Sequence, residues 1–228
     1  MVSRLCFPFL LCAGAVALAQ APVTLKSRVD SRGGGEAVIT NLKAVPLTAY
    51  LIQIFLEPCS PAPRPAVFRA ADAALTPGGE PLPQSQSRTE PLGAAYCNKD
   101  GVSVPARAEL KAAIYQDGSS FGEPQWVSSL LDSRRFQLEQ LEIALNGLKA
   151  RDAGSVPRQV LTADLEAGQA ASQEKKTFPF PCLLDVRELA LENLKAGAEA
   201  SLPDQIARTI KLFEQLRNKL LDARPSLR

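Results

Sequence analysis

The segment LTAYLIQIFL, residues 47–56, carries the strongest strand pattern in the chain. It is dense in aliphatic and aromatic side chains, which is the composition of a buried β-strand. Toward the N-terminus, residues 23–29 alternate apolar and polar side chains, and residues 36–41 form another candidate strand. The SRGGG run at residues 31–35 lies between these two and predicts a turn or a flexible loop. A β domain is therefore expected over residues 20–122.

Residues 57–91 differ in composition, because eight of the 18 prolines of the chain fall there. Proline removes a backbone donor and resists central strands. Long loops are therefore expected here, with one edge strand near residues 67–69. Strand patterns resume at residues 102–104 and 107–115, and the Asp117-Gly118 pair that follows is a strong turn signal.

After Gly122 the period of the apolar residues changes from two toward three and a half. Pro124 suits the first turn of a helix, and Gly147 and Gly154 suit its end, so a long amphipathic helix is predicted over residues 123–150. Its apolar stripe is interrupted by one arginine. The stripe consists of Val127, Leu131, Arg134, Leu138, Leu141, Leu145 and Leu148.

The remaining residues, 151–228, are predicted to be helical, with helices at 158–171, 184–198 and 203–222. Leaving the stripe of the long helix in water would cost more than the net stability of a typical domain, so the stripe must pack on the β domain, on the C-terminal helices or on another copy of the chain. We predict that the long helix and the last helix form an antiparallel pair. The competing arrangement is a homodimer through the long helix, with Arg134 setting the register. The last helix offers an apolar face made of Ile206, Ile210, Phe213, Leu216 and Leu220.

Residues 1–19 have the three parts of a secretory signal peptide. Arg4 supplies the positive charge, residues 5–18 form the apolar run, and Ala17-Leu18-Ala19 offers small residues for cleavage. The apolar run is shorter than the roughly 20 residues that a spanning helix needs. We therefore expect a secreted or periplasmic protein that begins near Gln20 or Pro22 and has no transmembrane segment after cleavage.

The chain contains no histidine, which excludes Ser-His-Asp and Cys-His catalysis and removes the commonest ligand of zinc and copper. Its net charge of +2 comes from 26 basic and 24 acidic residues, and no basic face favours nucleic acid. The glycines at 33–35 lack the Lys-Ser/Thr of a phosphate-binding loop. Ser119, Ser120, Ser128 and Ser129 lie near no distinctive lysine motif. No catalytic residue and no cofactor are therefore predicted.

Asp100, Asp117 and Glu123 fall near predicted turns, and a calcium site would require them to meet at one end of the β domain, because carboxylate oxygens are calcium ligands. Their spacing matches no calcium-binding loop, however, and the Asp117-Gly118 pair is explained by the turn alone. No metal site is predicted.

Three cysteines follow the predicted cleavage site, and an oxidising compartment favours one disulfide and one remaining thiol. Cys59 and Cys97 both fall in the β half, each in a loop beside a candidate strand, so they are the predicted pair. Their bridge would close a loop of about 38 residues and stabilise the fold by roughly 3–4 kcal/mol. The alternatives are three unpaired thiols, or Cys182 paired with either of the other two.

Several residues of the long helix are candidates for packing or for facing a partner. Trp126, the single tryptophan, is predicted to pack the junction with the β domain; the alternative is an exposed anchor for a partner. Arg134 is expected to pair with an acid such as Glu139 or Asp132, to cap a strand carbonyl, or to mark a partner contact. Further along the stripe follow Leu138, Leu141 and Leu145.

Six short pieces of the chain form a pattern of strand, turn, strand, hairpin and helix: VITN (38–41), PLTAY (46–50), LTPG (75–78), AAIYQDG (112–118), Gly122-Glu123, and Arg134-Arg135. This pattern resembles a group of uncharacterised exported bacterial proteins with an immunoglobulin-like β domain followed by a helix. The resemblance covers about half of the chain and implies a β-sandwich with an attached helix and no known activity. The proline-rich insertion with Cys59 departs from the pattern.

The expected fold is α+β, with an N-terminal immunoglobulin-like β-sandwich and a helical C-terminal half. The expected function is that of an exported structural or interaction module of the cell envelope, which binds a protein partner or itself and is not an enzyme. The alternative is a binding protein for a small apolar ligand between sheet and helices. A closed apolar cavity beneath the helices favours a ligand, whereas a filled core with an exposed apolar stripe favours a partner.

Overall fold

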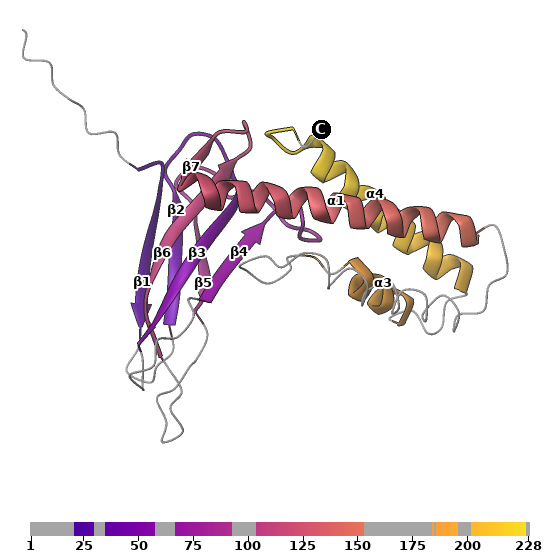
Figure 1. Cartoon of the computed structure of the whole chain (residues 1–228), viewed down its shortest axis with the longest axis horizontal. Coiled ribbons are helices and arrows are strands. Elements are labelled where there is room, and N and C mark those ends of the chain that lie inside the picture. The colour runs from indigo at the N-terminus through magenta and orange to yellow at the C-terminus, as the bar shows by residue number, and fades with distance from the viewer. Residues whose placement is uncertain are drawn as a thin grey trace, which may run out of the picture.

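The computed structural model describes residues 21–29, 35–57, 67–92, 104–152, 184, 186–195 and 202–226. Within them strands come first and helices follow, so the chain is a mixed α+β protein with a helical C-terminal part (Figure 1). The strands are β1 (Val23–Val29), β2 (Gly35–Asn41), β3 (Leu47–Glu57), β4 (Val67–Asp72), β5 (Ser87–Pro91), β6 (Val104–Tyr115) and β7 (Ser120–Gly122). The helices are α1 (Pro124–Asp152), α3 (Val186–Lys195) and α4 (Leu202–Asp222).

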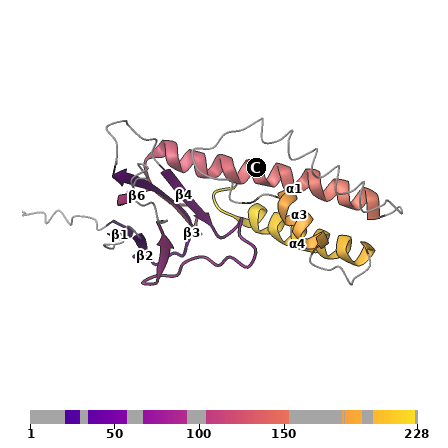
Figure 2. The same cartoon turned by 90° about the horizontal axis from the view of Figure 1, so that it is seen from below.

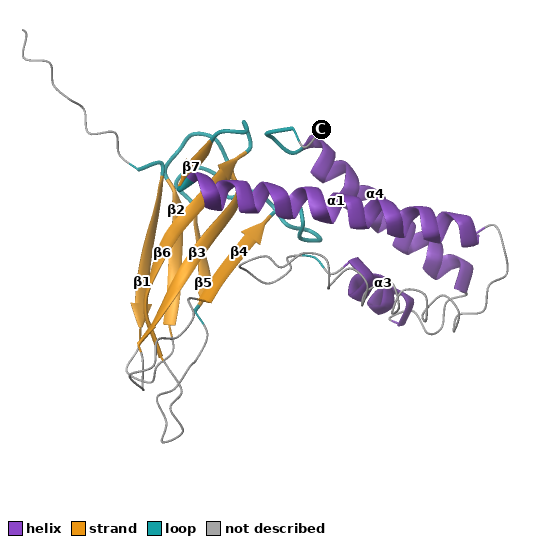
Figure 3. Ribbon diagram, viewed as in Figure 1, coloured by secondary structure: helices purple, strands orange, loops and turns teal. Residues whose placement is uncertain are grey.

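The strands form two antiparallel sheets (Figure 3), one in the order β1-β2-β5 and the other in the order β4-β3-β6-β7. The segment that carries the strongest strand pattern becomes β3, which pairs with β4 on one side and β6 on the other. This central place follows from its composition, because β3 has apolar side chains on both faces. Tyr50 and Ile52 contribute to the core on one side of the sheet, and Ala49 and Leu51 to the core on the other.

The two sheets share a hydrophobic core between their inner faces. Successive side chains of a strand point to opposite faces of a sheet, so the alternating pattern places Val23 and Leu25 of β1, and Ala37 and Ile39 of β2, on the side of this core. The core includes Val23, Ala37, Ile39, Tyr50, Ile52, Ile54, Ala113 and Tyr115.

The prediction of long loops over residues 57–91 is only partly right. The expected edge strand is present as β4, but β5 is a second strand that the prediction missed. Its Arg88 and Glu90 stand opposite the buried Ile39 and Ala37 of β2, so the inward positions of β5 are polar. The Tyr50 hydroxyl, from the facing sheet, hydrogen-bonds to Glu90. A contact between the sheets thus holds a strand that shows no apolar alternation.

Helix α1 begins over the four-stranded sheet and continues beside α3 and α4 (Figure 1). It contributes to a hydrophobic core in each of these places. Its first half packs on the outer face of the four-stranded sheet, where the stripe residues Val127 and Leu131 are partly buried against a cluster of Leu51, Ile114 and Leu130. Leu130, which lies outside the predicted stripe, is the fully buried α1 side chain of this cluster. Its second half extends beyond the sheet and packs on α3 and α4 through Leu141 and Leu145. The apolar stripe is therefore divided between a sheet contact and a helix contact. Arg134 lies between these two parts of the stripe.

Helix α4 runs antiparallel to the second half of α1, which confirms the predicted pairing (Figure 2). Two ion pairs show the direction, since Glu142 pairs with Arg217 at 3.4 Å and Lys149 pairs with Glu214 at 2.6 Å. The stripe is thus covered within one chain, and α3 packs against both helices. The apolar face of α4 contributes Ile206, Phe213, Leu216 and Leu220 to the shared core.

Several predictions fall outside the described residues, namely the signal peptide, the helix at 158–171, and the cysteines Cys59, Cys97 and Cys182. In the part of the chain that the structure describes, no helix has the length and apolar character needed to cross a membrane.

Candidate functional site

A buried ion pair lies where α1 leaves the four-stranded sheet. The side chains of Arg134 and Asp72 are both 0% exposed. Arg134 Nε donates to Asp72 Oδ2 at 2.6 Å and Nη2 donates to Oδ1 at 3.0 Å, a two-pronged geometry suited to the planar guanidinium. Arg134 was expected to pair with an acid such as Glu139 or Asp132, and this prediction is wrong, because its partner is Asp72. Both of those residues are on the exposed side of α1, and Asp132 pairs with Arg135 at 2.9 Å.

The same guanidinium group joins four parts of the fold. Nη2 also bonds to Thr48 Oγ1 on β3 at 3.2 Å, and Nη1 donates to the carbonyl oxygen of Arg224, beyond the end of α4, at 3.2 Å. Asp72 ends β4, and its Oδ1 accepts a bond from the Ala74 backbone N–H at 2.9 Å. Arg134 therefore connects β3, the end of β4, α1 and the segment after α4.

A cavity of about 250 Å³ lies beside this ion pair. Its walls come from the β domain, from α1 and from the end of α4. A cavity of roughly 150 Å³ accommodates benzene, so this one has room for a somewhat larger small molecule. We call it the junction cavity. It is lined by Thr48, Ala73, Ala74, Gly79, Pro81, Gln116, Arg134, Lys219, Asp222 and Ala223.

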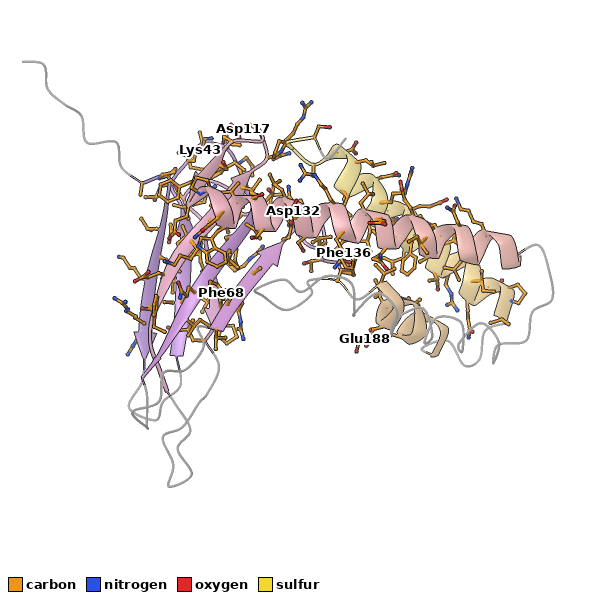
Figure 4. The ribbon with its side chains drawn as sticks, in the orientation of Figure 1. Lys43, Phe68, Asp117, Asp132, Phe136 and Glu188 are labelled. Carbon is orange, nitrogen blue, oxygen red and sulfur yellow. The ribbon has the colours of Figure 1, made fainter. Side chains whose placement is uncertain are left out.

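A second polar cluster lies at one end of the β domain, where Figure 4 shows Lys43 beside Asp117. Lys43 Nζ lies 3.1 Å from Asp117 Oδ2, contacts Ser119 Oγ, and lies 4.6 Å from the centroid of the Tyr115 ring. The Ser119 hydroxyl donates to Asp117 Oδ1 at 2.5 Å. The sequence did not reveal this Ser–Lys contact, because 76 positions separate the two residues.

The geometry of this cluster favours a structural role. A lysine activates a serine when it is neutral and desolvated, but Lys43 is paired with a carboxylate and its side chain is 29% exposed. Asp117 also accepts a bond from the Ser119 backbone N–H at 2.9 Å, which is the pattern of an Asx turn. The cluster therefore fastens the turn after β6 to the loop that precedes β3.

Hydrogen bonds from Ser119 hold the pKa of Asp117 at about 2, below the ordinary 3.8, and Lys43 adds a smaller effect. The stabilising contribution of this carboxylate is thus present above pH 3.8 and is lost as the pH falls toward 2. We expect Ser119→Ala to raise the pKa of Asp117 more than Lys43→Met does, because Ser119 is the larger cause. A carboxyl titration of both variants by NMR checks this order. The reverse order would show that the lysine charge dominates.

Two buried hydroxyls have no hydrogen-bond partner among the described residues, namely Tyr115 Oη and Ser133 Oγ. Burial, with the Asp117 charge as the second cause, raises the pKa of Tyr115 to about 12. The phenol is therefore neutral at physiological pH.

The structure places the other candidate residues in the core or near it. The Trp126 ring centroid lies 4.6 Å from that of Phe68 on β4, and the indole N–H donates to Glu123 Oε2 at 3.0 Å. Trp126 thus packs the junction of α1 with the sheet, as predicted. Leu141 and Leu145 are buried in the core between the helices, and Leu138 packs against that core while remaining partly exposed.

The carboxylates considered for calcium do not gather around one point within the described residues. Asp117 pairs with Lys43, whereas Glu123 pairs with Lys111 at 3.1 Å. Asp100 lies outside the described residues. Across the ranges that the structure covers, no group of three or more His, Cys, Asp or Glu side chains is arranged to hold a metal ion.

Comparisons of the chain with protein-family models, with curated proteins and with solved structures find no match.

Proposed function

We propose that this protein is an exported structural or protein-interaction module of the cell envelope, without catalytic activity. The course of α1 supports this proposal most strongly. This helix of 29 residues begins on the four-stranded sheet and continues into what we call the helical arm, formed by its second half with α3 and α4. The Arg134–Asp72 pair ties the arm to the β domain. A helical arm held in one orientation presents a defined surface to a partner or to a second copy.

We also infer that the β domain is an immunoglobulin-like sandwich. In that fold strands A, B and E share one sheet, strands C, F and G share the other, and variable-type domains add C′ beside C. The observed orders β1-β2-β5 and β4-β3-β6-β7 correspond to A-B-E and C′-C-F-G. This correspondence supports a relationship with the exported proteins that the sequence resembles.

Export to the periplasm or the medium is proposed from residues 1–19. N-terminal sequencing of the protein from its host tests it. A first residue near Gln20 or Pro22 is expected, because small residues precede both sites. Met1 on the abundant form would contradict export by this route.

Site-specific photo-crosslinking in intact cells tests the interaction role. A crosslinker replaces Ile143, which is 55% exposed on the arm, and a matched one replaces Lys26, which is exposed on β1. We expect an adduct of defined mass from position 143 and none from position 26. An adduct of twice the mass of the chain identifies self-association. The absence of adducts from position 143, and from Glu139 and Lys211 on the same arm, would contradict the proposal.

The junction cavity favours a second candidate function, the binding of a small, largely apolar ligand between sheet and helices. Ala73, Ala74, Pro81 and Ala223 provide apolar walls, as ligand sites generally do. Native mass spectrometry of protein purified from its host tests this function. A bound mass in the wild type that is lost in Ala74→Leu supports it, and an unliganded wild type contradicts it.

A further inference from the structure

The end of α4 returns to the β domain and is held there at several points. Lys219 Nζ donates to the carbonyl oxygen of Gly79, in the loop after β4, at 3.1 Å. Five residues later, the carbonyl oxygen of Arg224 accepts the bond from Arg134 Nη1 at 3.2 Å. Figure 1 shows this end of the chain beside the end of the sheets. The helical arm is therefore attached to the β domain both where α1 leaves it and where α4 comes back.

Residues 224 and 225, which follow α4, pack closely against Gly118. A Cβ atom at position 118 would lie 3.1 Å from Arg224 Cβ, and 3.2 Å and 3.3 Å from the N and Cα atoms of Pro225. Few Cβ atoms tolerate neighbours at these distances, because carbon atoms pack at about 3.5–4.0 Å. The positive φ of 86° at Gly118 is a separate requirement of the turn. Glycine at this position thus serves both the turn and the close approach of the C-terminal segment.

The same segment lies beside the junction cavity and beside Arg134. Asp222 and Ala223 form part of the wall of the junction cavity, and Arg134 lines that cavity too. Arg134 is nevertheless 0% exposed, and Arg224 covers one side of its guanidinium group by accepting the Nη1 hydrogen bond. Moving residues 223–226 away would remove Ala223 from the lining of the cavity and take one hydrogen-bond acceptor from the buried arginine at once.

We propose that residues 223–226 are a strap that covers Arg134 and holds the end of α4 on the β domain, so that release of the strap exposes Arg134 and widens the junction cavity. The strap is a conformational device and does not depend on the proposed function. The strap packs on the turn at Gly118. The hydrogen bond from Arg134 to the Arg224 carbonyl oxygen holds it in place, and the bond from Lys219 to the Gly79 carbonyl oxygen holds the preceding end of α4.

The test measures access to Arg134 with phenylglyoxal, a reagent that modifies exposed arginines, followed by peptide mass spectrometry. Arg135, whose side chain is 51% exposed, is the internal reference. In Gly118→Leu the new side chain occupies the space that Arg224 and Pro225 fill in the wild type. We expect the rate of modification of Arg134 relative to Arg135 to rise about tenfold or more, the factor that corresponds to the loss of a hydrogen bond from a charged donor.

Gly78→Leu is the matched control. Gly78 also has a positive φ, of 67°, but nothing lies within 4 Å of a Cβ placed there. A Cβ at this position carries the backbone strain and makes no contact with residues 223–226, so the Arg134 rate of Gly78→Leu should equal that of the wild type. A second variant that ends at Asp222 removes the strap and should match Gly118→Leu. If the truncated variant does not fold, the Arg134 modification rates of Gly118→Leu and Gly78→Leu are sufficient to test the proposal. Equal Arg134 rates in Gly118→Leu and Gly78→Leu would overturn the proposal.

Discussion

Asp72→Asn is expected to lower the free energy of unfolding by about 3–5 kcal/mol, the cost of leaving a buried charge without its partner. Asparagine has nearly the same size, and its carbonyl oxygen can still accept the bond from the Ala74 N–H. The amide NH2 group that replaces the other carboxylate oxygen cannot accept a hydrogen bond from the guanidinium group, which donates to both oxygens of Asp72. The loss therefore comes from the charge and from this hydrogen bond, and not from packing. Arg134 is 0% exposed and cannot regain hydration unless the junction opens. Urea unfolding followed by circular dichroism measures the change.

Asp132→Asn is the matched control, because it removes a carboxylate whose partner, Arg135, is as exposed as itself, each side chain at 51%. Such surface pairs contribute about 0–1 kcal/mol. The double variant Asp72→Asn with Arg134→Met removes both buried charges, and it should recover part of the stability that Asp72→Asn loses. If Asp72→Asn costs no more than Asp132→Asn, the pair does not hold the arm to the β domain.

Phe213→Ala is expected to destabilise the helical arm by about 3–5 kcal/mol, as large-to-small core substitutions of phenylalanine do. Phe213 is 0% exposed on α4 and shares a core with Leu141 and Leu216. That core is separate from the one between the sheets. The helical signal in circular dichroism should therefore be lost at a lower temperature than in the wild type. The fluorescence of Trp126, which reports the contact of α1 with the sheet, should change less.

Ile143→Ala serves as the control for Phe213→Ala, since Ile143 is 55% exposed on the same arm and surface substitutions usually stay within about 0.5 kcal/mol. Concentration dependence separates the intramolecular pair from a homodimer, because dimer stability rises with protein concentration. Leu138→Asp gives an independent answer. Loss of monomer stability agrees with the α1–α4 pair, whereas a folded monomer that no longer dimerises would favour the homodimer.

Apolar patterning along the chain was enough to identify the elements that carry the cores. A high density of aliphatic and aromatic side chains predicts β3, and a stripe that repeats at a helical period predicts α1. The pairing of α1 with α4 followed from two matching apolar faces that both need cover. These patterns are local properties of a segment. Burial of their apolar surface stabilises the fold wherever the segment lies in it.

The strands without such a pattern were missed for a physical reason. The inward positions of β5 are Arg88 and Glu90, which in sequence are indistinguishable from loop residues. They are tolerated because Tyr50 and the Glu80 carbonyl offer them hydrogen bonds. β7 has three residues, all exposed, so no apolar alternation marks it. Both strands form because they pair with a neighbouring strand, β5 with β2 and β7 with β6, and not because of an apolar pattern of their own.

In the candidate site, too, the sequence predicts one part and only the folded structure shows the other. The sequence by itself marked Arg134, because a charge that interrupts an apolar stripe must find a partner, but the acids nearest to it along the chain lie on the exposed side of α1. Its partner, Asp72, is 62 positions away, and the Arg224 carbonyl is 90 positions away. Sequence determined which segments are buried, since burial follows from the local pattern of apolar residues. Tertiary structure alone decided which buried charges meet, because an ion pair depends on distances that exist only after the chain has folded.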